Sequence, residues 1–249
     1  MKSDISFDRI ADRYDETRGG LSRGLGFVRV LDTLLEPGSD VLEIGVGTGA
    51  VAQPVVECGH QLWGIDLSRA MLTRAATRVG RLVEGDAARL PFAGDAFDAV
   101  IAVWALHVVG DQERLTHEID RVLRPKGRLI VVAPRPEVES NDLADLTFGW
   151  GRLLDKADRT EQVTRLLTAD GWSAVAQLAT AWEQTQETPA DRADSIERRD
   201  WSSLWDLDDE TWSRAIQPVI EALRGLPQPD RPRTLRVRYA VAAFTRDDG

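Results

Sequence analysis

The central part of the chain alternates short apolar runs with amphipathic stretches, and this alternation constrains the fold more than any other feature. Five runs have the length and the apolar composition of buried strands: 41–46, 61–66, 81–86, 97–104 and 127–134. Three of the four segments that separate neighbouring runs carry apolar residues at helical spacing: 49–59, 67–79 and 111–123. Strands that alternate with helices of this length indicate a parallel sheet with helices on both faces.

The last third of the chain extends this pattern. Two helices are predicted at 142–154 and 159–169, and two segments with strand-like alternation, 173–186 and 234–246, flank a mostly helical stretch. We therefore expect an α/β fold with a Rossmann-like, doubly wound, mostly parallel seven-stranded sheet. Helices cover both faces in this prediction, and a helical lid insertion lies near the C-terminus.

No segment has the composition of a linker between domains. We expect a single domain over residues 1–249, in which 1–35 form an N-terminal helical cap. Residues 187–226 form the helical insertion between the last two strands.

Charge and cysteine content argue against several classes of function. The 249 residues include 31 Lys and Arg against 41 Asp and Glu, a net charge of −10, which disfavours binding to nucleic acid. No apolar run approaches the roughly 20 residues of a membrane helix, and the acidic N-terminal segment lacks the apolar region of a signal peptide. We therefore expect a cytoplasmic protein. Cys58 is the one cysteine, and the histidines and acids lack metal-ligand spacing, so we expect neither a disulfide framework nor a metal.

Three glycines in five residues, Gly45, Gly47 and Gly49, follow the first predicted strand. Such a loop lets the backbone turn sharply and lets a ligand approach closely, and the amides of the next helix favour an anionic group. With Ala50, the first two glycines fit a dinucleotide fingerprint, whereas the three glycines together fit a loop that binds an adenosyl group with an amino-acid tail. Asp66 ends the second strand, where a carboxylate can accept from ribose hydroxyls in both cases.

Four ordered segments distinguish these possibilities. They are VLEIGVGTGA (41–50), GIDLSRAML (64–72), GDAARLPFAGDAFDAVIAVWALH (85–107) and LRPKGRLIVV (123–132). Together they resemble class I S-adenosylmethionine-dependent methyltransferases of the small-molecule type, the methyltransferase type 11 or ubiquinone/menaquinone-biosynthesis-like group. ADRYDETRGG (11–20) is similar to the N-terminal segment of the same group. A dinucleotide fingerprint does not predict the segment at 85–92, so the resemblance favours methyl transfer.

Carried onto this sequence, the resemblance implies S-adenosylmethionine as the cofactor and S-adenosylhomocysteine as its product. Glu43 would lie near the methionine amine of the cofactor. The backbone at Gly45, Gly47 and Gly49 would pass its methionine and ribose parts. Asp66 would accept hydrogen bonds from the ribose hydroxyls.

The resemblance also implies contacts to the adenine. Leu67 would lie along the ring, Asp86 would accept from the adenine amino group, and the amide of Ala87 would donate to a ring nitrogen. Met71 packs near the adenine or belongs to the ordinary core, because an apolar residue at helical spacing fits both interpretations.

Three further cofactor contacts come from other parts of the chain. Arg18 would pair with the carboxylate of the cofactor, because a guanidinium offers a fork to two oxygens, and Tyr14 would reach the sulfonium region. For both residues the alternative is a solvated helix face. Trp104 follows the fourth strand, where it would wall the cofactor or stack on the substrate.

His107 is the candidate catalytic residue. An imidazole has a pKa near the working pH and can act as a general base, although a helix cap or a packing role also fits this position. The implied reaction is an in-line displacement at the sulfonium methyl, with a small-molecule acceptor whose reacting atom is open. Four tryptophans of the last hundred residues would line an apolar acceptor pocket or form core between helices: Trp150, Trp182, Trp201 and Trp205.

Two other functions compete with methyl transfer. An NAD(P)-dependent oxidoreductase fits the glycine spacing and Asp66, but the two tyrosines, Tyr14 and Tyr239, both lack a lysine four residues on. A catalytically silent, cofactor-binding regulator would keep the same loop. A monomer and a homodimer are both compatible with the sequence, because the last strand can pair within its own sheet or across a dimer.

Overall fold

The computed structural model describes residues 7–153, 159–205 and 207–246. The chain forms two compact units, of which the first comprises Met1–Arg135, Asp158–Thr180 and Tyr239–Gly249. The second unit comprises Pro136–Ala157 and Ala181–Arg238. None of the described helices has the length and hydropathy that crossing a membrane requires.

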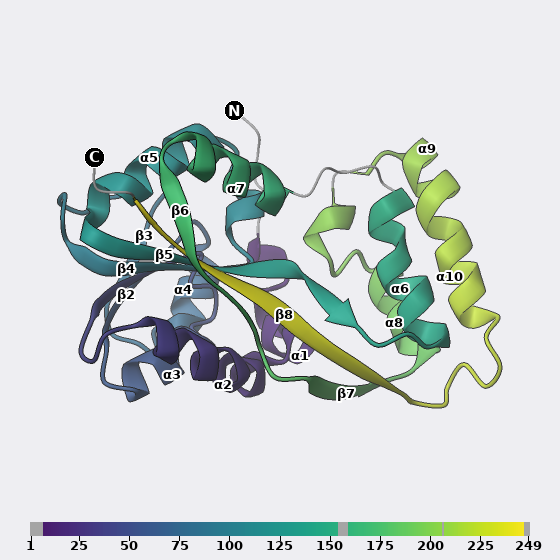
Figure 1. The fold of residues 1–249 in the computed structure, drawn as a ribbon. Coiled ribbons are helices and arrows are strands. Elements are labelled where there is room, and N and C mark those ends of the chain that lie inside the picture. The colour runs from purple at the N-terminus through teal and green to yellow at the C-terminus, as the bar shows by residue number, and fades with distance from the viewer. Residues whose placement is uncertain (1–6, 154–158, 206, 247–249) are drawn as a thin grey trace. The chain divides into compact units, whose positions relative to one another are not determined.

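The described strands form one mixed sheet (Figure 1). They are β1 (Asp40–Ile44), β2 (Gln61–Asp66), β3 (Leu82–Glu84), β4 (Phe97–Val103), β5 (Leu123–Val138), β6 (Trp172–Ala179), β7 (Glu183–Glu187) and β8 (Arg233–Arg246). The order is β3-β2-β1-β4-β5-β8-β6, and β7 also pairs with β8. Strands β1 to β5 are parallel, whereas β8 is antiparallel to β6 and β7. The predicted doubly wound, mostly parallel sheet is therefore confirmed.

Helices of the first unit cover both faces of its sheet, as the sequence predicts. They are α1 (Tyr14–Arg18), α2 (Gly20–Leu31), α3 (Ala52–Glu57), α4 (Arg69–Ala75), α5 (Gln112–Val122) and α7 (Arg159–Ala169). Helices α2 and α3 lie on one face, and α5 and α7 lie on the other (Figure 1). Ser68 caps α4, since its hydroxyl accepts from the amide of Met71 at 3.1 Å.

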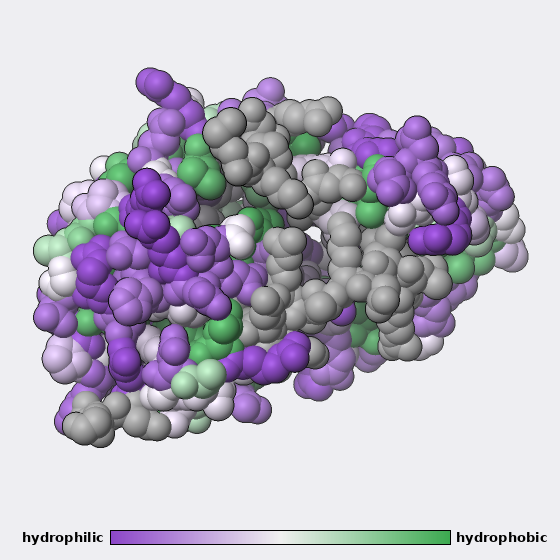
Figure 2. All heavy atoms as spheres, turned by 90° about the horizontal axis from the view of Figure 1, so that it is seen from above, coloured by the Kyte–Doolittle hydropathy of each residue, from purple (hydrophilic) through white to green (hydrophobic). Residues whose placement is uncertain are grey.

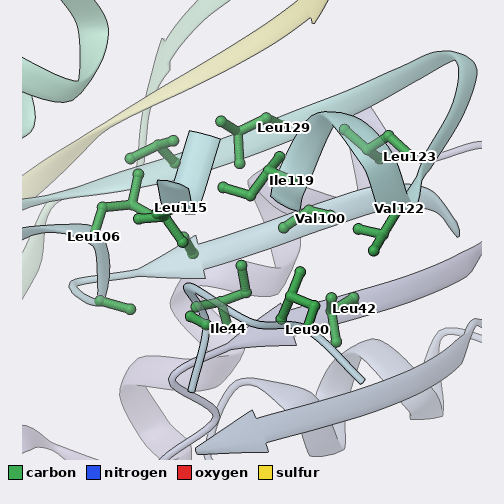
Figure 3. Close-up of a cluster of buried hydrophobic side chains, with 14 of the residues drawn as sticks. Leu42, Ile44, Leu90, Val100, Leu106, Leu115, Ile119, Val122, Leu123 and Leu129 are labelled. Atoms are coloured by element: carbon green, nitrogen blue, oxygen red, sulfur yellow. The ribbon is translucent and has the colours of Figure 1, made fainter. Parts of the chain in front are cut away.

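One buried hydrophobic cluster of the first unit lies between the sheet and α5 (Figure 3). Leu115, Ile119 and Val122 follow one another at spacings of four and three residues, so one face of the helix presents all three to the strands. Each is fully buried, as are Val100 and Leu129 of the facing strands. Burying one such side chain contributes roughly 1.5–3 kcal/mol. This packing fixes the strands whose carboxyl ends carry the site.

The sheet has eight strands rather than the predicted seven, because the segment 173–186 forms two strands, β6 and β7. β6 pairs with β8 as far as Ala179, opposite Ala240, and β7 begins at Glu183, opposite Val237. Three residues of the segment therefore face two of β8, which breaks the ladder. At the break, the amide of Tyr239 donates to the hydroxyl of Thr180 at 3.0 Å. Pairing with a distant strand sets this interruption, so the local alternation does not reveal it.

The second unit has a separate small core. Its helices are α6 (Asp142–Leu153), α8 (Pro189–Glu197), α9 (Asp209–Thr211) and α10 (Gln217–Arg224), and its buried cluster includes Leu143, Ile196 and Ile220. The described part of 187–226 is largely helical, while its action as a lid stays a prediction. The single domain over 1–249 and the cap at 1–35 also stay predictions. Figure 2 shows hydrophilic residues over most of the described surface in that view.

Candidate functional site

The loop after β1 requires glycine at two positions. Gly45 has a φ of +69°, and a Cβ there would lie 2.7 Å from the Cβ of Ala105. Gly49 has a φ of +76°, and a Cβ there would lie 3.3 Å from Ala75. Side chains at these positions would strain the backbone and clash. The backbone of the loop therefore approaches its neighbours closely, and at Gly45 and Gly47 it lines a pocket.

Asp66 joins this loop to the start of α4. Its Oδ2 accepts from the amide of Gly47 at 2.9 Å, and its Oδ1 accepts from the amide of Ser68 at 2.8 Å. Burial raises the pKa of Asp66, and these backbone hydrogen bonds oppose that rise. The carboxylate thus fixes the loop and stands at the carboxyl end of β2, where ligands of α/β sheets bind.

Glu43, one residue before the end of β1, is a buried carboxylate with an unsatisfied oxygen. Its side chain is 2% exposed, and Oε2 has no hydrogen-bond partner among the described residues. Burial, together with the charge of Asp66, raises the pKa of Glu43 well above its ordinary value. A buried acceptor without a donor costs roughly 1–3 kcal/mol or more. A ligand that brings a positively charged donor would offset this cost.

The pocket above Glu43 draws its walls from three parts of the first unit. Its lining includes Tyr14, Asp15, Arg18, Arg23, Gly24 and Phe27 of the N-terminal helices, Thr48 of the loop with Ala50 and Val51 after it, and Val103 and Trp104 at the end of β4. Carboxylates, guanidinium groups and aromatic rings therefore share one concave surface at the carboxyl edge of the sheet. Such a surface suits a ligand that carries both an ammonium and a carboxylate.

Trp104 and Phe27 of the pocket lining belong to an aromatic cluster. Trp104 has a φ of +54°, a conformation that is strained for a bulky residue. Its indole packs edge-on against Phe27, with ring centroids 5.5 Å apart. It also contacts Tyr239 in a tilted arrangement, with ring centroids 5.0 Å apart. The guanidinium of Arg23 lies over both rings, 5.3 Å from the centroid of Trp104 and 5.7 Å from that of Tyr239. The indole Nε1 is buried and lacks an acceptor among the described residues.

Three carboxylates tie residues 7–19, here called the N-terminal strap, to the region around α4. Asp8 accepts from the hydroxyl of Ser68, and Asp12 pairs with Arg74. Asp15 accepts from the hydroxyl of Thr48 and pairs with Arg78, both at 2.5 Å. These contacts hold α1 beside the glycine loop.

The strap also carries two of the residues singled out in the sequence. The guanidinium of Arg18 lies 6.0 Å from the ring centroid of Tyr14. Burial raises the pKa of Tyr14, so the phenol stays protonated at neutral pH.

The structure brings together six of the predicted residues in one pocket: Tyr14, Arg18, Glu43, Gly45, Gly47 and Trp104. Gly49 belongs to the same loop, and Asp66 accepts from the amide of Gly47 in that loop. Met71 is 1% exposed and belongs to the buried interior. The individual roles of these residues stay predictions.

The predicted adenine contacts and the predicted base lie outside this lining. Leu67 is 72% exposed, and Asp86 is an exposed carboxylate that accepts from the amide of Ala88 at 2.9 Å. Ala87 beside it is buried. His107 lies in a short 3-10 helix, Leu106–Val108, just beyond β4. Trp150 lies outside the residues whose side chains the structure describes.

The pocket lining also contains three residues that were not expected from the sequence: Asp15, Arg23 and Phe27. Asp15 lies within the segment already singled out by its resemblance, next to Tyr14. Arg23 and Phe27 are four residues apart on α2, so they lie on one face of that helix. This spacing is the one local signal for Arg23 and Phe27, and by itself it does not distinguish a pocket face from a solvated one. Within the described residues, no group of three or more histidines, cysteines or acids could hold a metal ion.

Comparison with known proteins relates this site to a family. Residues 42–131 match the model of the methyltransferase domain family Methyltransf_11. The chain is 38% identical over 129 residues to the demethylmenaquinone methyltransferase of Mycobacterium tuberculosis, which is 50% of this chain and 55% of that protein. The chain thus spans about half the length of the curated relatives that it matches.

Solved structures share the fold at low identity. A putative methyltransferase from Bacillus halodurans is 17% identical with a TM-score of 0.57, and the likeness covers 92% of this chain and 99% of that one. Phosphoethanolamine N-methyltransferase 2 of Haemonchus contortus, solved with S-adenosylhomocysteine, is 19% identical with a TM-score of 0.56. That likeness covers 97% of this chain and 58% of the other. At these identities the likeness concerns the fold alone.

Proposed function

We propose that this chain, which contains a class I S-adenosylmethionine-dependent methyltransferase domain, is an enzyme that transfers a methyl group to a small-molecule acceptor. The observation that carries the proposal is the buried, unsatisfied Oε2 of Glu43 below the glycine loop. An amino-acid ammonium is a donor of the charge and size that this oxygen lacks. A dinucleotide carries no ammonium, so the same oxygen disfavours a nicotinamide cofactor.

The residues of the pocket divide the work of holding the cofactor. Glu43 accepts from the methionine ammonium, and Arg18 pairs with the methionine carboxylate through its planar fork. Asp66 keeps lone pairs for the ribose hydroxyls beside the two amides that it already accepts from. Tyr14 closes the pocket from the N-terminal side. When bound, S-adenosylmethionine supplies a methyl group on a positively charged sulfur, which a nucleophile displaces in line.

The chain contributes mainly position and exclusion of water in this proposal. Holding two reacting groups in line can be worth roughly 7–11 kcal/mol in favourable cases. Leu67, Asp86 and Ala87 hold the adenine, with Met71 behind them. His107 removes the proton of an acceptor that must lose one, since an imidazole needs no large pKa shift for this role.

The acceptor is a small molecule, and the relatives direct the first choice among candidates. Demethylmenaquinone is named as the substrate of relatives that match half of this chain, so hydroxylated naphthoquinols are the acceptors to assay first. We propose that 1–35 cap the cofactor and that 187–226 form a lid within one domain. The net charge of −10 disfavours a nucleic-acid partner. The proposed enzyme is cytoplasmic and acts as a monomer or a homodimer.

Calorimetric titration tests the choice of cofactor. We expect S-adenosylmethionine and S-adenosylhomocysteine to bind with micromolar affinity, and NADH and NADPH not to bind. Binding of a nicotinamide cofactor alone would contradict the proposal and support an oxidoreductase. Binding of the adenosyl ligands, with no transfer of a labelled methyl group to any acceptor, would support a silent regulator.

Two variants connect the cofactor to the site. Asp66→Asn removes a charged acceptor and weakens a bond to Gly47, so S-adenosylhomocysteine affinity falls by about ten- to a hundredfold, as expected for a charged hydrogen bond worth roughly 1.5–3 kcal/mol. The matched control is Asp230→Asn, the same change at an exposed position of the second unit, which leaves affinity unchanged. Equal affinities in the two variants would remove Asp66 from the proposed site.

A further inference from the structure

We infer that Glu118 and Arg121 of α5 position segment 85–92 and thereby set how strongly the site distinguishes adenine from other purines. The inference rests on the proposed function, which assigns Asp86 and Ala87 of this segment to the adenine. The proposed function itself gives neither of the two α5 side chains a role.

Segment 85–92 forms neither helix nor strand, so other contacts must fix its backbone. It follows β3, which runs parallel to β2, at the carboxyl edge of the sheet where α/β proteins bind ligands. At its start, the amide of Gly85 donates to the carbonyl of Asp66 at 3.0 Å. Asp86 then stabilises a turn, because its side chain accepts from the amide of Ala88 at 2.9 Å. These contacts fix the first half of the segment.

An ion pair of α5 fixes the second half. Arg121 donates to Glu118 through two hydrogen bonds, from Nε to Oε1 at 2.9 Å and from Nη2 to Oε2 at 2.8 Å. Oε2 of Glu118 also accepts from the amide of Leu90 at 2.7 Å, and Nη2 of Arg121 donates to the carbonyl of Leu90 at 3.0 Å. Nη1 donates to the carbonyl of Phe92 at 2.8 Å. The pair therefore binds both backbone polar groups of Leu90 and a second carbonyl of the segment.

Both members of the pair are charged at neutral pH. The hydrogen bond from Arg121 lowers the pKa of Glu118, and the same contact raises the pKa of Arg121. Hydrogen bonds with an ionised partner are stronger than those between neutral groups. A guanidinium that its own carboxylate holds in one plane also offers its remaining N–H groups in fixed directions. The pair is thus suited to fix the orientation of a backbone.

The side chains of the segment anchor it independently of the pair. Leu90 is 5% exposed and belongs to the same buried cluster as Ile119 of α5 (Figure 3). The ring of Phe92 lies edge-on to those of Trp63 and Phe97, with centroids 5.8 Å and 5.1 Å apart. Burial of this kind has no direction, whereas hydrogen bonds depend on angle. Loss of the pair should therefore disturb the orientation of the segment more than the fold.

Two ligands that differ in the base test the inference. Hypoxanthine has a carbonyl where adenine has its amino group, so it presents an acceptor to the carboxylate of Asp86. The ratio of the dissociation constants of S-inosylhomocysteine and S-adenosylhomocysteine therefore reports on the contact to the base. Calorimetric titration of the wild type should give a ratio of at least about ten, because a hydrogen bond to a charged group is worth about a factor of ten or more.

Variants assign this discrimination to the pair. Arg121→Gln should lower the ratio at least about threefold, because a hydrogen bond weakens steeply when its geometry changes. Glu118→Gln removes the charge that holds the guanidinium and should act in the same direction. Arg121→Lys keeps the charge without the planar fork and should give an intermediate ratio. The matched control is Arg114→Gln, at an exposed arginine of the same helix that acts on Glu118 only through its charge, and it should keep the wild-type ratio.

The outcomes separate the inference from the proposed function. Failure of S-adenosylhomocysteine to bind the wild type defeats the proposed function. Binding of both ligands with equal affinity by the wild type overturns the inference. An unchanged ratio in the pair variants also overturns it, even where thermal unfolding shows a lower melting temperature, because a purely structural pair stabilises the fold without affecting the choice of base. An equal fall of the ratio in Arg114→Gln assigns the effect to charge alone and overturns it as well. If Arg121→Gln does not fold, Arg121→Lys and Glu118→Gln decide between the same outcomes.

Discussion

Replacing Gly24 by alanine should destabilise the protein, although the same change stabilises most helices. Gly24 lies inside α2, where alanine has a propensity advantage of about 1 kcal/mol over glycine. A Cβ at this position would lie 2.7 Å from the carbonyl carbon of Ala50 and still nearer to its oxygen, whereas ordinary contact begins at 3.4 Å. Helix α2 therefore has to move by more than about 0.7 Å away from the segment after the glycine loop.

The clash should outweigh the gain in helix propensity. Overpacking of a close contact costs roughly 1–3 kcal/mol, and the obstacle here is backbone, which cannot rotate away. After the propensity gain of about 1 kcal/mol, the free energy of unfolding should fall by up to about 2 kcal/mol. For a chain of this size, that lowers the melting temperature by up to about 8 °C. The pocket residues Arg23 and Phe27 move with the helix, so S-adenosylhomocysteine affinity should fall too.

The matched control makes the same change where space is open. No heavy atom lies within 4 Å of the Cβ position at Gly80, and its φ is not left-handed. Gly80→Ala should leave stability unchanged or raise it by about 0.4–1 kcal/mol. Urea unfolding and thermal scans of both variants measure the difference. A Gly24→Ala protein as stable as Gly80→Ala would refute the close approach of α2 and its role in placing Arg23.

Three further predictions concern the charges of the site. The raised pKa of Glu43 means that its contribution to stability is full below the ordinary pKa of 4.5 and is lost as pH rises through the pKa of the folded protein. Ligand-free Glu43→Gln should therefore gain stability relative to the wild type with rising pH, while it binds S-adenosylhomocysteine more weakly. A difference in unfolding free energy that stays constant between pH 5 and pH 8, measured by urea unfolding, contradicts this. Asp15→Asn removes the partly buried ion pair with Arg78 and should speed S-adenosylhomocysteine dissociation several-fold in stopped-flow measurements. Asp12→Asn removes an ion pair in which the aspartate side chain is 92% exposed, so its dissociation rate should match that of the wild type. His107→Gln should lower turnover of a protonated acceptor with unchanged cofactor affinity, and normal turnover would remove His107 as the base.

Local sequence patterns predict those parts of the fold that depend on interactions between residues close in the sequence. The match to the methyltransferase domain family confirms the resemblance inferred from the four ordered segments. The hydroxyl of Ser68 caps α4, and local sequence can predict such a cap, because an N-cap needs only its own first turn. The interruption at Thr180 was not predictable, since a strand more than fifty residues away creates it. The sequence contains strand β8, but no local feature of it indicates the register in which β8 pairs with β6 and β7.

The same division applies to the candidate site. Gly45 and Gly49 were predictable because their spacing follows a strand directly, and their left-handed φ angles agree with that expectation. Arg23 was not, because a single arginine on an amphipathic helix gives the same pattern whether it faces solvent or a ring. Only the packing of Phe27 against Trp104 and Tyr239 distinguishes the two cases.

During the proposed cofactor exchange, the ion pairs of the N-terminal strap should break in a defined order. Exposure of its ion pairs falls along the chain, from 92% for the carboxylate of Asp12 to 29% for that of Asp15. Salt screens the exposed Asp12–Arg74 pair more strongly than the partly buried Asp15–Arg78 pair. The strap should therefore detach first at Asp12 and last at Asp15. Ionic strength would then set how fast the cofactor is exchanged, while the contacts that set its equilibrium affinity stay the same.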